Sequence, residues 1–229
     1  MLSFFICIFV KMISKAVENY LKAIFSLSED GNDNVSTNSI AKKLNTKASS
    51  VTDMLRKLTL NQLVNHEKYK GVSLTTKGKK LATNIVRKHR LWETFLVEKL
   101  HFNWDEVHDV AEQLEHIKSD KLVTLLDEFL GNPKFDPHGD PIPDEFGKFP
   151  TSNSTPLSNL KEGDKGIVMG VSQDNSTFLK FLDKIDIKLG NLILVKDIIE
   201  FDSSVEILIN NKESHISLEV ARNILVKQK

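Results

Sequence analysis

Five of the six prolines fall within one stretch of twenty residues, and this stretch separates two parts of the chain with different patterning. Residues 131–150 read GNPKFDPHGDPIPDEFGKFP and carry no apolar stripe at helical spacing. Proline lacks a backbone donor and clashes with the preceding turn of a helix, so neither a helix nor a central strand is expected here. The stretch is therefore predicted to be a loop or linker between a helical part and a part rich in strands.

Upstream of this loop, apolar residues recur at the three- and four-residue spacing of helices. Helices are predicted over residues 14–28, 38–44, 48–60, 76–100, 104–117 and 120–130. Ser36 and Ser119 stand where N-caps are expected. The helices over 38–44 and 48–60 are short and joined by a brief turn, which fits a helix-turn-helix.

Two strand-like segments, 63–67 and 72–75, follow the second of these helices. Between them lie Lys68, Tyr69, Lys70 and Gly71. The pattern predicts a β-hairpin with a basic tip, the wing of a winged helix. An ordinary surface hairpin is the alternative, since lysine is common on strand edges.

Downstream of the loop the pattern changes to short apolar strands separated by turns. Strands are predicted over 163–171, 177–182, 192–199, 205–210 and 223–226, and 217–222 has room for one helical turn. Short strands at this density are typical of a small β-barrel.

The net charge of zero hides a strong asymmetry along the chain. Residues 12–90 contain 15 Lys and Arg against 6 Asp and Glu, whereas residues 91–150 contain 5 against 14. The basic part favours a polyanionic partner and the acidic part favours cations, although patchy charge also serves only to solvate a face.

The N-terminal residues need an explanation of their own. The apolar run 1–10 is too short to span a bilayer and lacks the basic start and small-residue cleavage site of a signal peptide. We expect Met12 to be the natural start and residues 1–11 to be a non-native extension; a membrane-docking N-terminus is the alternative. The single cysteine, Cys7, excludes a disulfide framework and fits a reducing cytoplasm.

The residues with the clearest chemistry lie on two predicted helices. His108, Glu112, Glu115 and His116 are spaced so that all can project to one side of a helix, and His89 and Glu93 form an i, i+4 pair on the preceding helix. Imidazoles and carboxylates together suit a first-row divalent ion, provided that the two helices are antiparallel neighbours. Solvated or salt-bridged surface pairs remain the simpler alternative.

Common catalytic motifs are missing from the sequence. It contains no HExxH, HxxEH, G-x-S-x-G, P-loop or G-x-G-x-x-G pattern, so an enzyme is not expected. A metal-dependent hydrolase is kept only as a minor alternative.

Several segments resemble the diphtheria toxin repressor family (DtxR/MntR) of metal-dependent transcriptional regulators. They are ENYLKAIFSL at 18–27, ASSVTDMLRKL at 48–58, KGVSLTTKGKKLA at 70–82, KHRLWE at 88–93 and HDVAEQLEH at 108–116. The resemblance covers residues 14 to about 150, and the remainder is similar to the family's SH3-like (FeoA-like) domain. It implies a mainly α chain: a winged helix-turn-helix over 12–76, a helical metal-binding and dimerisation domain with its Pro-rich linker over 77–150, and a small SH3-like barrel over 151–229.

The resemblance also implies the ligands of two metal sites. A primary site is expected from Asn19, Glu112, Glu115 and His116, and an ancillary site from His89, Glu93 and His108, with His89 and the glutamates able to bridge. The loop Asp136-Pro137-His138-Gly139 resembles a ligand-donating loop, which makes His138 a further candidate; Asp136 stands where a cysteine can occur.

The ligand types indicate which metal is expected. The iron branch of the family has cysteine at the position of Glu112, and hard oxygen in place of sulfur favours Mn(II), with Fe(II) as the alternative. Asn19 departs from the pattern because manganese-type members often carry aspartate there, and Lys22 replaces a second acidic ligand.

On this interpretation the chain is a cytoplasmic homodimer that binds a palindromic operator and represses metal uptake. Ser49, Ser50, Thr52 and Arg56 are expected to face the DNA groove, and Lys47, Lys68, Tyr69 and Lys70 to contact mostly phosphates. A metal-independent winged-helix regulator is the competing class.

Overall fold

The computed structural model describes residues 14–29, 34–67, 70–151, 153–173 and 175–229. The expected N-terminal extension, Met12, Lys68 and Tyr69 lie outside these residues. The chain divides into two compact units, Met1–Ile85 and Val86–Lys229. The boundary falls inside one long helix, α4 (Thr76–Leu100).

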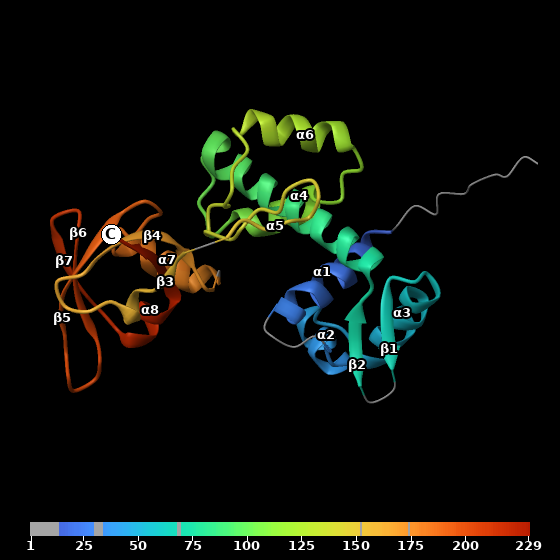
Figure 1. Cartoon of the computed structure of the whole chain (residues 1–229), viewed down its shortest axis with the longest axis horizontal. Helices are drawn as coiled ribbons and strands as arrows, with labels where there is room; N and C mark the ends of the chain where they lie inside the picture. Colours follow the sequence, from blue (N-terminus) through green and yellow to red (C-terminus); the bar gives the residue numbers. More distant parts are fainter. Residues whose placement is uncertain (1–13, 30–33, 68–69, 152, 174) are drawn as a thin grey trace, which may run out of the picture. The chain divides into compact units, whose positions relative to one another are not determined.

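The first unit is a winged helix-turn-helix (Figure 1). It contains α1 (Lys15–Glu29), α2 (Thr37–Lys43), α3 (Ala48–Leu60) and the antiparallel pair β1 (Val64–Glu67) and β2 (Gly71–Leu74). Ser36 caps α2 as predicted, accepting a hydrogen bond from the Ser39 amide at 3.0 Å. The buried face of α3 consists of Val51, Leu55 and Leu58, whose spacing is that of one side of a helix. This burial leaves the opposite face of α3 at the surface.

The second unit begins with helices. α4 continues from Val86, followed by α5 (Val107–Leu114) and α6 (Asp120–Phe129), which Ser119 caps as predicted. Leu91, Leu96, Val107 and Ala111 form the centre of their shared core. α5 is shorter than predicted, because residues 104–106 form a turn and the Trp104 side chain belongs to a different core.

The proline-rich segment is a loop, as predicted, but it packs on α4 rather than serving as a spacer. Arg87 donates to the carbonyl of Pro143 at 2.7 Å, and Arg90 donates to the carbonyl of Pro141 at 2.6 Å. A proline has a backbone carbonyl but no N–H donor. The two arginines of α4 supply donors to these carbonyls. The loop therefore has a fixed position beside the metal-ligand candidates of α4.

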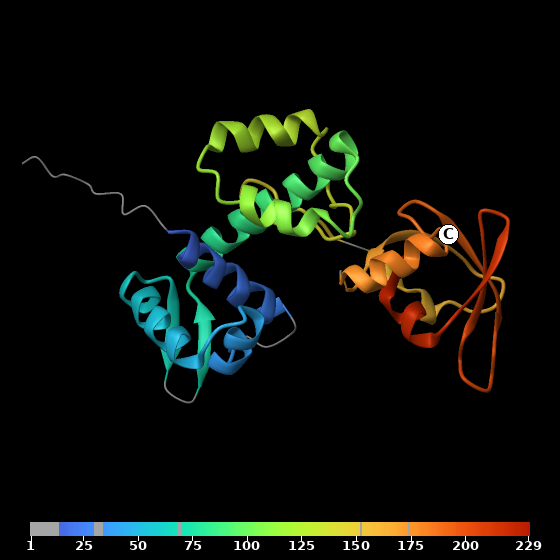
Figure 2. The ribbon, with the colours of Figure 1, turned by 180° about the vertical axis from the view of Figure 1, so that it is seen from behind.

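The rest of the second unit is a six-stranded antiparallel sheet in the order β3-β8-β4-β5-β6-β7 (Figures 1 and 2). Its elements are β3 (Thr155–Pro156), η1 (Leu157–Asn159), β4 (Lys165–Val171), α7 (Ser176–Lys184), β5 (Leu192–Ile198), β6 (Val205–Ile209), β7 (Lys212–Ile216), α8 (Leu218–Asn223) and β8 (Ile224–Gln228). Both views show α7 and α8 on one side of this domain and the β5–β7 strands on the other. One apolar core fills it, confirming the predicted small SH3-like domain.

One predicted strand is wrong: Thr177–Leu182 lies in helix α7. Asn175 caps this helix through its side chain, which accepts from the Phe178 amide at 2.9 Å. Leu179 and Leu182, three residues apart, point into the core together. A short apolar run does not distinguish a buried strand from a buried helical turn, and here the cap decides. The short strands β3 and β7 were not predicted.

Within the described residues, none of the helices has the length and apolar character needed to span a membrane.

Candidate metal centre

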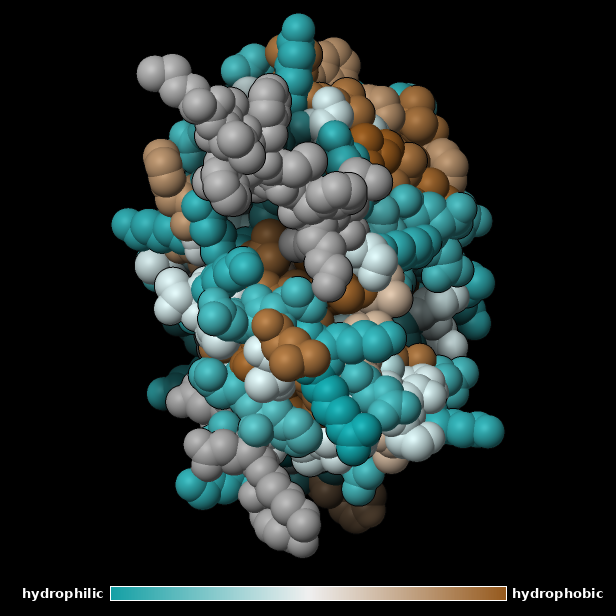
Figure 3. Space-filling model, turned by 90° about the vertical axis from the view of Figure 1, so that its right-hand side faces the viewer, coloured by the Kyte–Doolittle hydropathy of each residue, from teal (hydrophilic) through white to brown (hydrophobic). Residues whose placement is uncertain are grey.

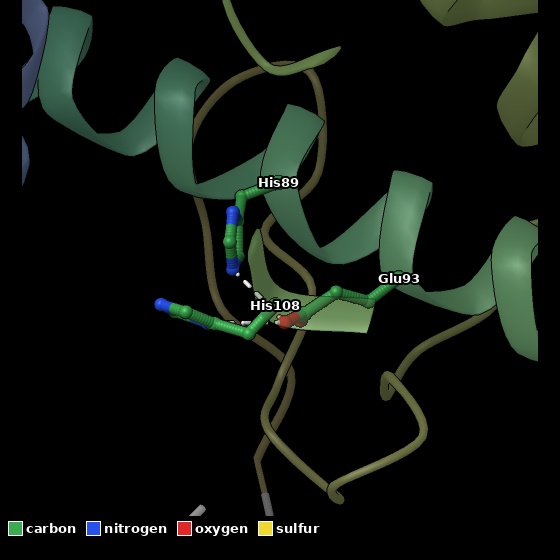
Figure 4. A group of neighbouring side chains, drawn as sticks. All are labelled: His89, Glu93 and His108. Atoms are coloured by element: carbon green, nitrogen blue, oxygen red, sulfur yellow. Dashed lines mark ion pairs between the residues drawn. The ribbon is translucent and has the colours of Figure 1, made fainter. Parts of the chain in front are cut away.

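The predicted ancillary ligands converge between α4 and α5. His89 and Glu93 lie one turn apart on α4 and are buried, with His89 Nε2 3.0 Å from Glu93 Oε1. His108 of α5 points at the same oxygen, with its Nδ1 atom at 3.4 Å. Figure 4 shows the three side chains pointing toward one another from the two helices. Suitable atoms of all three lie within 4.8 Å of one another, so the three residues form a possible metal-ligand group.

A second group shares His89. Its other ring nitrogen, Nδ1, lies 2.7 Å from Glu115 Oε2, and His89, Glu112 and Glu115 also offer atoms within 4.8 Å of one another. Glu115 caps the C-terminal end of α5 and is completely buried. His116 follows it, with Nε2 3.7 Å from Glu115 Oε1. The structure therefore places His89 between the two predicted carboxylate sets.

A third group involves the proline-rich loop and shares Glu93. It consists of Glu93, Asp136 and His138, all buried. His138 Nε2 lies 2.7 Å from the carbonyl oxygen of Trp104. A carbonyl only accepts, so Nε2 carries a proton and Nδ1 is the ring nitrogen left to serve as a ligand atom. Nδ1 is the atom on the side of Glu93, 3.9 Å from Oε2.

Asp136 is a candidate ligand that the sequence reasoning noticed only as a replaced cysteine. Its Oδ1 atom accepts from the His138 and Asp140 amides at 2.8 and 3.0 Å. Its Oδ2 atom is buried and accepts no hydrogen bond, and Arg90 Nε stands 3.7 Å away. A carboxylate oxygen buried in this way is costly without a cation. In the sequence, the feature that could have identified Asp136 as a ligand is its position two residues before a histidine in a loop rich in proline.

The two carboxylates at the centre of the site, Glu93 and Asp136, have pKa values shifted in opposite directions. Burial by itself would raise the pKa of Glu93, but hydrogen bonds with His108 and His89 and the charges of His89 and His138 lower it. Burial raises the pKa of Asp136 well above its usual value, and the charges of Glu93 and Asp140 raise it further, only partly opposed by Arg90. Glu93 is therefore held as an anion, whereas Asp136 ionises reluctantly.

These residues fit a hard divalent cation. Their donors are oxygens and imidazole nitrogens from three segments of the second unit, and a buried Asp136 oxygen accepts no hydrogen bond. Asn19 lies in α1 of the first unit, and its Oδ1 atom is likewise buried without a hydrogen-bond partner. That Asn19 completes the primary site stays a prediction.

The predicted DNA-contacting residues lie mostly at the surface of the first unit. Lys47, Ser49 and Ser50 are exposed at the start of α3, and Arg56 is exposed beside Asp53, with Nη1 3.2 Å from its carboxylate. Lys70 is exposed next to β2. Thr52 is only partly exposed, and its hydroxyl donates to the carbonyl of Ala48 at 3.0 Å.

Comparison with known proteins matches all three parts of the chain. The iron dependent repressor N-terminal DNA binding domain matches residues 12–72, the iron dependent repressor metal binding and dimerisation domain matches 75–144, and the FeoA domain matches 155–228. A solved manganese-dependent transcriptional repressor, in complex with manganese, is 37% identical with a TM-score of 0.80 and covers 93% of this chain and 100% of its own.

Two curated relatives agree with these matches. An uncharacterized HTH-type transcriptional regulator of Methanocaldococcus jannaschii is 37% identical over 118 residues, which are 52% of this chain and 94% of that protein. The diphtheria toxin repressor of Corynebacterium jeikeium is 32% identical over 126 residues, 55% of this chain. The match spans 52% of the corynebacterial protein, about half its length.

A winged helix, a helical domain with buried imidazoles and carboxylates, and an SH3-like domain together define a metal-dependent, DNA-binding transcriptional regulator. Within that class, the chain belongs to the iron-dependent repressor family, the family of the diphtheria toxin repressor and of manganese-dependent repressors.

Proposed function

We propose that this chain is a repressor of metal uptake that binds its operator when a divalent ion, Mn(II) in preference to Fe(II), occupies the α4–α5 site. The observation that supports the proposal most directly is the convergence of buried His89, Glu93 and Glu115 from α4 and the end of α5. Surface ion pairs are a poor explanation, since these three side chains are at most 7% exposed.

The preference for Mn(II) follows from the donor set. Every candidate ligand is an oxygen or an imidazole nitrogen, and the chain's only cysteine is Cys7. Such donors suit Mn(II), whereas thiolates favour softer ions. A similar solved protein is described as manganese-dependent. The metal bound in the cell also depends on which metals are supplied, and an operator-binding assay with defined metals controls this supply.

In the proposed switch, a bound ion supplies positive charge that neutralises the converging carboxylates. α4 holds His89 and Glu93 rigidly one turn apart, and the end of α5 presents Glu112, Glu115 and His116 to the same helix. Asn19 of α1 is proposed to join them and so to couple the site to the DNA-binding unit. The ion shifts the population only through its higher affinity for the DNA-competent arrangement.

The proposed functional state is a homodimer on a palindromic operator, which implies a cytoplasmic location. α6 carries Leu122, Leu125 and Phe129 at 38, 50 and 65% exposure, more apolar surface than a monomeric helix needs. On the face drawn in Figure 3, hydrophilic residues predominate, and hydrophobic ones gather at the upper right and in a smaller group near the centre. A two-fold dimer would present two copies of α3 to half-sites one helical turn apart.

Fluorescence anisotropy with a labelled operator tests the proposal. Glu115→Gln should abolish the response to Mn(II), since it removes the buried carboxylate next to His89, whereas Glu98→Gln on the exposed side of α4 should respond like wild type. Fe(II), Zn(II) and a chelator complete the series. Operator binding without any metal dependence would instead identify a metal-independent winged-helix regulator. Turnover of a generic ester or peptide would support a hydrolase.

A further inference from the structure

Trp104 connects the helical part of the second unit to the sheet domain. It lies in the turn before α5, yet its side chain packs in the apolar core of the sheet domain with residues such as Leu179 and Leu182. Its indole Nε1 donates to Asp183 Oδ2 of α7 at 3.1 Å. Beside it, Asp105 pairs with Lys180 of the same helix at 3.4 Å. α7 therefore holds the turn at two adjacent residues.

Trp104 also contacts the candidate metal ligand His138 and orients its ring. The Trp104 carbonyl accepts the proton of His138 Nε2, and the two rings are nearly parallel, at 8° with centroids 6.3 Å apart. This contact fixes the ring orientation and the tautomer together. His138 Nδ1 is left on the side of Glu93, 3.9 Å from Oε2.

The sheet domain also holds the main chain of His138. The Val171 amide of β4 donates to the His138 carbonyl at 2.8 Å. Gly139 and Gly170 pack backbone against backbone: a Cβ added to Gly139 would lie 2.3 Å from Gly170 Cα, and one added to Gly170 would lie 2.5 Å from the His138 oxygen. Only glycine permits this approach. The ring and the main chain of His138 are thus both positioned by the sheet domain.

We infer that the sheet domain is a positioning element for the Glu93–Asp136–His138 metal group, acting through Asp183, Trp104 and β4. Trp104 and Asp183 are positioning residues that touch no metal. Partners that orient a histidine ligand typically change metal affinity by about 10- to 100-fold. Asp183 acts one step further away and at the surface, so a loss of about tenfold is expected from removing it. The inference rests on the proposed function.

Asp183→Ala is a suitable test because it spares the helix that carries it. Asp183 lies in the last turn of α7, where a negative charge opposes the helix dipole, and alanine is a better helix former. Loss of α7 structure is therefore not the expected effect. Asp183→Asn keeps an acceptor for the indole and should restore wild-type behaviour. Lys180→Met breaks the neighbouring contact between the same two elements and is the matched control.

Two measurements on the full chain test the inference. In isothermal titration with Mn(II), Asp183→Ala should weaken the class of sites that includes His138 about tenfold and change the other classes less. Asp183→Asn and Lys180→Met should match wild type, and His138→Gln should show the loss of that class. In metal-free protein, long-range ¹H–¹⁵N NMR should show His138 as the Nε2–H tautomer in wild type and as a mixture in Asp183→Ala.

The outcomes separate the inference from the proposed function. An Asp183→Ala protein with wild-type titration and tautomer overturns the inference. An equal loss in Lys180→Met also overturns it, because general docking would then explain the effect. A wild-type protein that binds no Mn(II), yet shows the tautomer change, contradicts the proposed function while the positioning of His138 stands.

Discussion

Replacing Asp136 with asparagine should stabilise the metal-free protein and weaken its metal binding. The amide oxygen of Asp136→Asn can keep both backbone hydrogen bonds that Oδ1 accepts from His138 and Asp140. The variant loses a buried negative charge whose pKa is raised by burial and by Glu93 and Asp140. A residue retained at a cost to stability is typical of a functional site.

The magnitude follows from the surrounding charges. Attraction to Arg90 at 3.7 Å is about 4.5 kcal/mol at an effective dielectric constant of 20. Repulsion from Glu93, whose ligand atom lies within 4.8 Å, is about 3.5 kcal/mol or more. Asp140 adds to the repulsion, so the charge terms nearly cancel and desolvation decides. We expect a gain of about 1–2 kcal/mol, or roughly 3–6 °C in Tm.

The sign of the pH dependence is fixed by the raised pKa. About one unit or more below the ordinary aspartate pKa of about 4, the carboxyl is protonated in both folded and unfolded chains, and Asp136→Asn should match wild type. As pH rises from there through the raised folded pKa, the folded wild type keeps its proton while the unfolded chain ionises, so wild-type stability falls. The advantage of the variant should grow across this window and then level off.

Thermal melts with chelator and with excess Mn(II) measure both effects. A tenfold loss of affinity lowers the stabilisation by saturating Mn(II) by about 1.4 kcal/mol. Glu145→Gln is the control, because its carboxylate belongs to the same loop but is exposed. A metal-free Asp136→Asn protein that melts below wild type at neutral pH, or that gains its advantage toward acid pH, would refute this reasoning.

Three further predictions concern other parts of the chain. Asn175→Ala should cost about 1 kcal/mol in chemical denaturation, since it removes the cap of α7; no change would mean that the cap is dispensable. Lys47→Ala with Lys70→Ala should reduce the salt slope of operator binding by about one unit per lost phosphate contact, and an unchanged slope would place both lysines away from DNA. Leu125→Asp should shift sedimentation toward the monomer if exposed α6 forms the dimer interface, and an intact dimer argues against that surface.

The sequence predicted the helices whose apolar spacing and capping residues lie within the helix itself or next to it. α3 and α4 begin and end where the periodicity placed them, and Ser36 and Ser119 cap as expected. Thr177–Leu182 was wrong because an isolated apolar run fits either secondary structure until its neighbours are known. The predicted start of α5 at Trp104 was wrong for a related reason. The Trp104 side chain packs in a core formed by later residues and donates to Asp183, 79 positions along the chain.

The candidate site was predictable only within each helix. Spacing identified His89 with Glu93, and His108 with Glu112, because residues four apart share a helical face. Spacing carries no information on which side chains meet across helices, so the position of His89 between two carboxylate sets came only from the structure. Asp136 was underrated because its importance depends on complete burial, which a proline-rich loop does not indicate.

The three ligand groups share residues, and this limits how independently they can act. Glu93 belongs to the groups with His108 and with His138, while His89 belongs to those with Glu93 and with Glu115. An ion held by Glu93 and His138 would compete with one held by Glu93 and His108 for the same carboxylate. Residues in one network are not additive on substitution. Occupancy of the loop group by an ion would therefore be linked to occupancy of the α4–α5 groups through the buried carboxylate of Glu93.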